Sequence, residues 1–256
     1  MARDSISITE ADRSVLGPLA EHRILIVSQV ASLLGVSEGA ASRRLQRLKG
    51  AGLVHYERVF HGAPAAARIT SRGLHAIEHS LRTPNENLHE YRHDVGVGWL
   101  WLAARAGAFG AVSHVAADRE MRAADGSADA EGRPATYGVG LGMIGSRGRP
   151  QRHYPDLILD MTSGHEVAVE LELTQKSSRR MARIMTAYAS DARVDAVLYL
   201  VPNRAIAELV SDAARRAGIA DMVHVQRIAP DGIAGSQPRS AQRTQRQALV
   251  AREAER

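Results

Sequence analysis

Apolar residues in the first 82 positions recur at helical spacing in three short segments, and strand-like runs follow them. Helices are predicted for residues 9–21, 28–34 and 37–49. Gly35 supplies the turn between the second and the third helix. Two β-favouring runs, 53–60 and 68–70, flank a turn-forming stretch, and another helix is predicted for residues 71–81. The order is therefore helix, helix, turn, helix, hairpin, helix.

The rest of the chain alternates between strand and helix patterns. A linker at residue 83 leads into an amphipathic helix that ends near residue 105. Residues 125–150 hold seven glycines and two prolines among few apolar anchors, so we expect a long loop or a disordered insertion there. Strands are then predicted for residues 156–161, 166–173, 196–201 and 222–228, and helices for residues 177–188 and 205–217. This alternation predicts an α/β domain.

These patterns divide the chain of 256 residues into three parts. Residues 1–82 form a first domain, and residues 83–228 form a helical connector with the α/β domain. The tail, residues 229–256, has five arginines against three acids and little apolar periodicity. We expect the tail to be disordered and to add unspecific contact with phosphates.

The composition is basic and excludes several kinds of chemistry. The chain has 33 lysines and arginines against 28 acids and a pI near 9.9, which favours an anionic partner. It contains no cysteine, so disulfides, thiolate zinc sites and cysteine nucleophiles are excluded. No window approaches the ~18 uninterrupted apolar residues of a membrane span, and the N-terminus lacks a signal-peptide core. We therefore expect a cytoplasmic protein without a membrane partner.

The predicted third helix has one apolar face and one basic face. Its polar positions are left for solvent or for DNA, and they are Ser42, Arg43, Arg44, Gln46, Arg47 and Lys49. Arg58 and Arg68 lie on the predicted hairpin, and residues 39–82 together hold eight basic residues and two acids. This cationic half of the domain favours contact with duplex DNA. In the alternative interpretation the domain mediates dimerisation or protein interaction, and the arginines form a solvated face.

The first domain resembles winged helix-turn-helix domains of the MarR and ArsR kind. The matching residues are 30–34, Gly35, Val36, Ser37 and 43–48. The resemblance implies that the third helix enters the major groove of double-stranded DNA while the hairpin wing lies against the phosphate backbone. It makes Arg43, Arg44 and Arg47 the first candidates for DNA contact.

Acidic residues gather on two neighbouring strands of the predicted α/β domain. Asp156 begins one strand. On the next strand side chains alternate, which places three acids on one face: Glu166, Glu170 and Glu172. Carboxylates from adjacent strands can converge on a divalent cation such as Mg²⁺, which would activate water for phosphodiester attack. Asp156 and Glu170 are the expected metal ligands. The alternative is an edge strand whose acids face solvent and bind no metal.

This segment resembles the core of the PD-(D/E)xK nuclease superfamily, in which a hairpin bears Pro-Asp and then acid-x-Lys, followed by a helix and further strands. Pro155-Asp156 and Glu170 fit that pattern, whereas Glu172 stands where the lysine is expected. The resemblance implies the catalytic set Asp156, Glu170, Glu172 and Lys176. In a second interpretation the fold only binds DNA, and basic residues at the start of the following helix hold phosphates. These residues are Lys176, Arg179, Arg180 and Arg183.

Most of the chain also resembles the replication-relaxation proteins of actinobacterial plasmids and integrated elements. The likeness rests on Pro155, Asp156, Glu170, Glu172, Arg179, Arg180, Arg183 and Tyr188. It implies a DNA-binding protein that acts in replication, relaxation or transfer of a mobile element, with α+β and α/β architecture; a homodimer is compatible with this role. Two alternatives stay open. One is a transcriptional regulator whose second domain senses a ligand or dimerises, and the other is a metal-dependent endonuclease.

Overall fold

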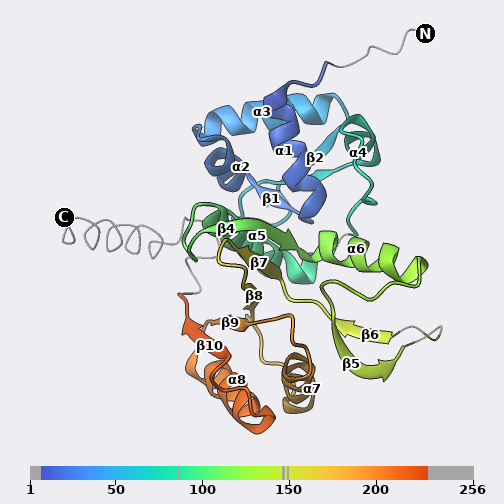
Figure 1. The fold of residues 1–256 in the computed structure, drawn as a ribbon. Helices are drawn as coiled ribbons and strands as arrows, with labels where there is room; N and C mark the ends of the chain where they lie inside the picture. Colours follow the sequence, from blue (N-terminus) through green and yellow to red (C-terminus); the bar gives the residue numbers. More distant parts are fainter. Residues whose placement is uncertain (1–6, 86, 146–147, 149, 230–256) are drawn as a thin grey trace, which may run out of the picture. The chain divides into compact units, whose positions relative to one another are not determined.

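The computed structural model of the chain describes residues 7–85, 87–145, 148 and 150–229. The fold is mixed α+β and divides into two compact units (Figure 1), the first ending at Leu102 and the second beginning at Ala103. This division falls further along the chain than residue 82, where the sequence pattern places the end of the first domain. The predicted tail lies outside the described residues except for Ala229.

Unit 1 contains short helices and a small antiparallel sheet. Its elements are α1 (Glu10–Glu21), β1 (Leu25–Ile26), α2 (Val27–Leu34), α3 (Glu38–Gly50), β2 (Val54–Glu57), β3 (Ala66–Ile69), α4 (Ser71–Ala76), the 3-10 helix η1 (Leu88–Glu90) and most of α5 (Tyr91–Arg105). The strand order is β1-β3-β2. The sequence pattern does not predict β1, because two residues are too few to show an alternation.

Local signals and burial together explain the first three helices. Thr9 caps α1, because its hydroxyl accepts the backbone N–H of Asp12 while the Asp12 carboxylate accepts the backbone N–H of Thr9. Gly35 ends α2 with a φ of 63°, a left-handed conformation that glycine adopts without strain. Leu16, Leu45 and Leu48 are fully buried in the core of the unit. The three predicted helices are confirmed, with ends that shift by one residue.

The segment expected to connect two domains is mostly part of unit 1. The Gln29 side chain accepts the backbone N–H of Ile26 and donates to the carbonyl of Val95 on α5 at 2.7 Å. Trp99 and Ile26 are buried in the same cluster. The helix predicted for residues 71–81 is shorter than expected and ends at Ala76.

Unit 2 is built on a five-stranded sheet with the order β10-β9-β8-β7-β4 (Figure 1). Its elements after α5 are β4 (Val112–Ala117), α6 (Asp118–Ala130), β5 (Val139–Ile144), β6 (Pro150–His153), β7 (Leu157–Met161), β8 (Glu166–Leu171), α7 (Ser178–Ala189), β9 (Ala196–Val201), α8 (Arg204–Ala217) and β10 (Val223–Arg227). β4, β7 and β8 are antiparallel, whereas β8, β9 and β10 are parallel because α7 and α8 cross over between them. The strands and helices predicted beyond residue 156 are confirmed.

The glycine-rich segment 125–150 is not a long loop, so that prediction is wrong for its described residues. It holds the end of α6, strand β5 and the start of β6. Asp125 explains the order, because its buried carboxylate accepts the backbone N–H groups of Thr136, Tyr137 and Gly138 at 2.7–3.1 Å. A prediction from composition cannot detect these hydrogen bonds, because they join residues that lie 11–13 positions apart.

β8 is a central strand, which overturns the interpretation that its acids lie on an exposed edge. Both faces of its second half are covered, since Val169 and Ala168 are fully buried and Glu170 is only 4% exposed. No helix among the described residues is long and apolar enough to cross a membrane.

Candidate functional site

The basic residues predicted on α3 differ in what they contact. Arg44 and Arg47 both form ion pairs with Oδ1 of Asp12 on α1, and the Arg44 contact is 2.8 Å. Ser42 accepts the Tyr56 hydroxyl at 3.1 Å, so this serine is engaged inside the unit. These four residues of α1 and α3 therefore make contacts within the unit that the sequence alone did not reveal.

Asp12 is completely buried, so its charge depends on its partners. Burial raises the pKa of this carboxyl, but hydrogen bonds from Arg47, Thr9 and Arg44 lower the pKa further, to about 2. The carboxylate is thus ionised at neutral pH and uses part of the hydrogen-bonding capacity of two arginines. Their side chains keep 30% and 47% exposure, so both arginines remain partly at the surface.

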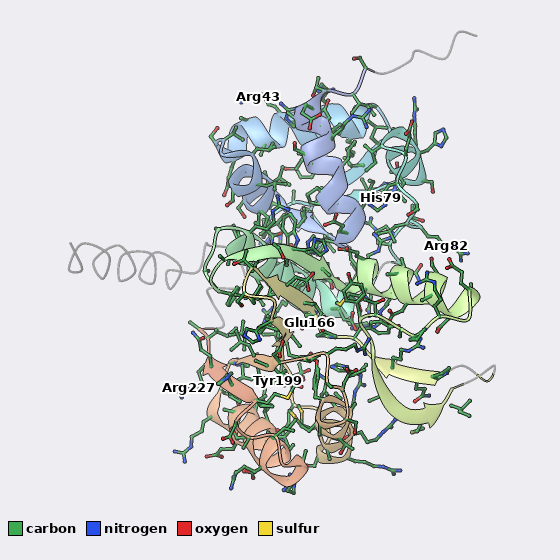
Figure 2. The ribbon with its side chains drawn as sticks, viewed as in Figure 1. Arg43, His79, Arg82, Glu166, Tyr199 and Arg227 are labelled. Carbon is green, nitrogen blue, oxygen red and sulfur yellow. The ribbon has the colours of Figure 1, made fainter. Side chains whose placement is uncertain are left out.

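The other predicted DNA-binding residues of unit 1 fall into two groups. Lys49 donates to the carbonyl of Tyr56 at 2.9 Å, and Arg68 pairs with Glu57 at 3.1 Å. Arg43 on α3 (Figure 2) and Arg58 beyond β2 are exposed and have no hydrogen-bond or ion-pair partner among the described residues. Gln46 is exposed and unengaged in the same way.

In unit 2, the hairpin β7–β8 brings together the three predicted catalytic acids. We call Asp156, Glu170 and Glu172 the acidic cluster. Asp156 immediately precedes β7, and its Oδ2 accepts the backbone N–H of Leu171 at 2.7 Å. Glu172 follows β8 and its backbone N–H continues the ladder to β9. The three acids also interact electrostatically. Burial raises the pKa of Glu172 most, and the nearby charges of Glu170 and Asp156 raise it further.

Glu170 is held by two side chains that the predicted catalytic set does not include. Its Oε1 contacts Nε2 of His153 on β6 at 2.5 Å and accepts the hydroxyl of Tyr188 on α7 at 2.6 Å. The rings of His153 and Tyr188 meet edge to face at 5.8 Å. The carboxylate thus joins three elements: the hairpin β5–β6, the central strand β8 and helix α7.

Glu172 and Lys176 form an ion pair, so the two predicted catalytic residues that follow β8 neutralise each other. Burial raises the pKa of Glu172 and the charge of Lys176 opposes that rise, with a net upward shift. On β9, Tyr199 (Figure 2) is fully buried, and its hydroxyl has no hydrogen-bond partner among the described residues. Burial and then the charges of Glu170 and Glu172 raise the pKa of Tyr199 well above its ordinary value.

Several oxygens that a magnesium ion would need are already engaged in the acidic cluster. Mg²⁺ requires near-octahedral coordination by free oxygens. Here Oε1 of Glu170 is shared by two donors and Glu172 is paired with an ammonium group. Within residues 7–229, as far as they are described, no group of three or more carboxylate and histidine side chains is placed to hold a metal ion. The cluster is a hydrogen-bonded network in which Lys176 pairs with one of the three acids.

The basic residues predicted at the start of α7 do not join the acidic cluster as a set. Arg179 and Arg180 are exposed, whereas Arg183 is half-buried. Ser177 caps the helix by accepting the backbone N–H of Arg180. Lys176 contacts Glu172 of the cluster.

His153 and Tyr199 are the residues of this network that the sequence analysis missed. His153 lies three residues beyond the glycine-rich segment, at the end of β6, where no alternating pattern predicts a strand. Tyr199 lies in a strand that was predicted for its apolar residues, and nothing local distinguishes its hydroxyl from those of other tyrosines.

Comparison with known proteins adds little. No family model matches the chain, and no curated protein matches it. One solved structure with local similarity is the crystal structure of RV1404 from Mycobacterium tuberculosis, with 23% identity over 50% of this chain and 76% of that chain. Its TM-score of 0.26 is too low to support an argument about fold or function.

Proposed function

We propose that this chain binds double-stranded DNA through unit 1, as a winged helix-turn-helix in which α3 is the recognition helix and β2–β3 is the wing. The element order α1-β1-α2-α3-β2-β3 and the sheet order β1-β3-β2 suit that fold. The observation that carries the proposal is the outer face of α3. It presents the cation of Arg43, which has no partner in the described part of the chain, while Arg58 offers a second such cation beside β2.

For unit 2 we propose a nuclease-like fold that engages DNA without cutting it. The hairpin β7–β8 carries Pro155-Asp156 and Glu170 and is followed by α7 and a parallel strand, in the order that the nuclease superfamily pattern requires. The acids are occupied by His153, Tyr188 and Lys176. Exposed Arg179 and Arg180 would then supply phosphate contacts.

The resemblance to replication-relaxation proteins supports a role at the DNA of a plasmid or another mobile element. A protein that holds a duplex without cleaving it can act there by marking a site or by presenting DNA to a partner enzyme. This role is the most specific one that the residues of both units support together.

Duplex binding tests the proposal. The full chain is titrated against a labelled 30-base-pair duplex and against one of its single strands, in chelator, between 50 and 200 mM salt. We expect preference for the duplex and an affinity that falls steeply with salt, because arginines that contact phosphates release counterions. Arg58→Ala should lower the logarithmic salt slope by about one.

Arg204→Ala is the matched control. The Arg204 side chain is 83% exposed on α8 and pairs with Glu208 one turn away, so its removal deletes the same charge at a site outside the proposed interface. Its salt slope should equal that of the wild type. Absence of duplex binding at 50 mM salt, or equal affinity for the single strand, would refute the proposal.

A further inference from the structure

Among the polar residues predicted to contact DNA on α3, Arg43 and Gln46 are exposed and have no partner among the described residues, and they lie on one stripe. Gly39, Arg43, Gln46 and Gly50 are all exposed and follow one another at spacings of four, three and four residues. Such spacings place them along one line of the helix surface. The buried residues Ala41, Leu45 and Leu48 occupy the opposite side.

The neighbouring arginines are held away from this stripe. Arg44 and Arg47 both reach toward the buried carboxylate of Asp12 and share its Oδ1. A guanidinium that is bound to a carboxylate has fewer N–H groups free for a fork-like contact with a base edge. Arg44 and Arg47 can therefore offer charge to nearby phosphates, but they are not oriented to read a base.

The two glycines of the stripe have no packing explanation. A Cβ atom built at Gly50 meets nothing within 4 Å, and one built at Gly39 meets only the Arg43 guanidinium, at 3.6 Å. Neither glycine has the positive φ that excludes other residues. Glycine is unfavourable in a helix relative to alanine, so its presence at both ends of the stripe fits a backbone that another molecule approaches closely.

We propose that Arg43 and Gln46 read base edges of duplex DNA in the major groove, on a stripe of α3 bounded by Gly39 and Gly50, while Asp12 keeps Arg44 and Arg47 out of that role. This inference rests on the proposed DNA binding and makes it more specific. Arginine pairs with the O6 and N7 acceptors of guanine, and glutamine pairs with N6 and N7 of adenine. The recognised site should therefore contain a guanine and an adenine at neighbouring positions.

Selection from a random duplex library with the full chain tests the assignment. Arg43→Ala and Gln46→Ala should each relax the preference at one base position and weaken binding to the selected site by about tenfold. Arg43→Lys keeps the charge but loses the two parallel N–H donors of the guanidinium. It should therefore retain the salt slope and still lose the guanine preference. Arg58→Ala is the control, because loss of a phosphate contact lowers affinity for all sequences alike.

The glycines supply a second, independent readout. Gly39→Ala and Gly50→Ala should leave the melting temperature unchanged or higher, because alanine favours a helix and meets no backbone there. Each should nevertheless weaken duplex binding, which a purely structural role of the glycine would not explain.

The outcomes separate this inference from the proposed function. If the wild-type chain binds no duplex, the proposed DNA binding fails. Binding without any sequence preference, or an identical preference in wild type, Arg43→Ala and Gln46→Ala, would leave DNA binding intact and overturn the base-reading pair. A preference that shifts only in Arg44→Ala or Arg47→Ala would overturn it as well.

Discussion

The buried charge of Asp12 changes how the neighbouring arginines of α3 are interpreted. From the sequence, Arg44 and Arg47 look equivalent to Arg43, since all three lie on the polar side of one helix. In the fold the first two compensate a carboxylate with no exposed surface, and the third does not. Replacing all three together would therefore confuse loss of DNA contact with loss of stability, because it would leave Asp12 buried without its partners.

The stability of unit 1 should depend on the ionisation of Asp12. Its folded pKa of about 2 lies below the ordinary value of 3.8, so the carboxylate stabilises the fold above pH 4 and this contribution is lost as pH falls toward 2. The difference corresponds to about 2 kcal/mol in unfolding free energy. Denaturant unfolding followed from pH 5 downward should show this loss in the wild type and a flatter profile in Asp12→Asn. Parallel profiles for the two proteins would contradict the assignment.

At the scale of elements, the β5–β6 hairpin depends on one buried carboxylate. Asp125 accepts three backbone N–H groups in the segment that leads into β5, and these donors would be left unsatisfied without it. We expect Asp125→Ala to destabilise unit 2 by about 1–3 kcal/mol, since an unpaired buried donor such as that of Gly138 costs roughly this much, whereas the bonds from Thr136 and Tyr137 are only partly buried. Hydrogen exchange should become faster at residues 136–138.

Asp129→Ala is the control for this change. Asp129 lies on the same helix and pairs with Arg152 at 2.7 Å, but it is exposed at the surface. An exposed ion pair contributes only about 0–1 kcal/mol. An equal loss of stability in both variants would show that the number of backbone donors does not explain the order of the hairpin.

A second element-scale prediction concerns the start of β8, where Glu166 lies directly opposite Asp160 of β7. Burial and then this like charge raise the pKa of Glu166 to about 7, above its ordinary value of 4.5. A carboxyl with a raised folded pKa weakens the fold as pH rises from 4.5 through 7. Glu166→Gln should therefore stabilise unit 2 at pH 8, by about 1–2 kcal/mol after solvent screening, and have little effect at pH 4. Thermal unfolding at the two pH values measures the difference, and an equal effect at both would contradict it.

The elements that the sequence predicts are those with a local signature. α1, α3 and α7 have capping residues and an apolar face, and β9 is a continuous apolar run, so period and caps are enough to find them. β4 and β6 have no such pattern, and they form because partners far along the chain pair with them. The same distinction between local patterns and distant partners applies to the acidic cluster. Its carboxylates were visible in the sequence, whereas the histidine, tyrosine and lysine contacts that decide their chemistry needed the fold.

For the whole molecule, both units surround a buried acid with donors, Asp12 in unit 1 and Glu170 in unit 2. Arg43 and Arg58 of unit 1 are exposed and have no hydrogen-bond or ion-pair partner among the described residues, so their charges are available to an anion. Unit 2 surrounds its acids with donors, and the buried Glu170 joins three elements through His153 and Tyr188. A buried acid with this set of partners contributes to stability in the place where a nuclease would need free carboxylate oxygens.

This contrast predicts how the full chain responds to divalent metal. An ion bound with a dissociation constant of roughly 0.1 mM would stabilise the folded state by about 2.7 kcal/mol at 10 mM. We expect no such shift in melting temperature with Mg²⁺ or Mn²⁺ relative to chelator, and supercoiled plasmid should remain intact. Glu170→Gln should give the same gel pattern but a lower melting temperature, because the amide fits the two donors of Glu170 less well. Metal-dependent nicking that is lost in Glu170→Gln, together with metal stabilisation of the wild type alone, would instead make the chain an endonuclease whose network rearranges to admit the ion.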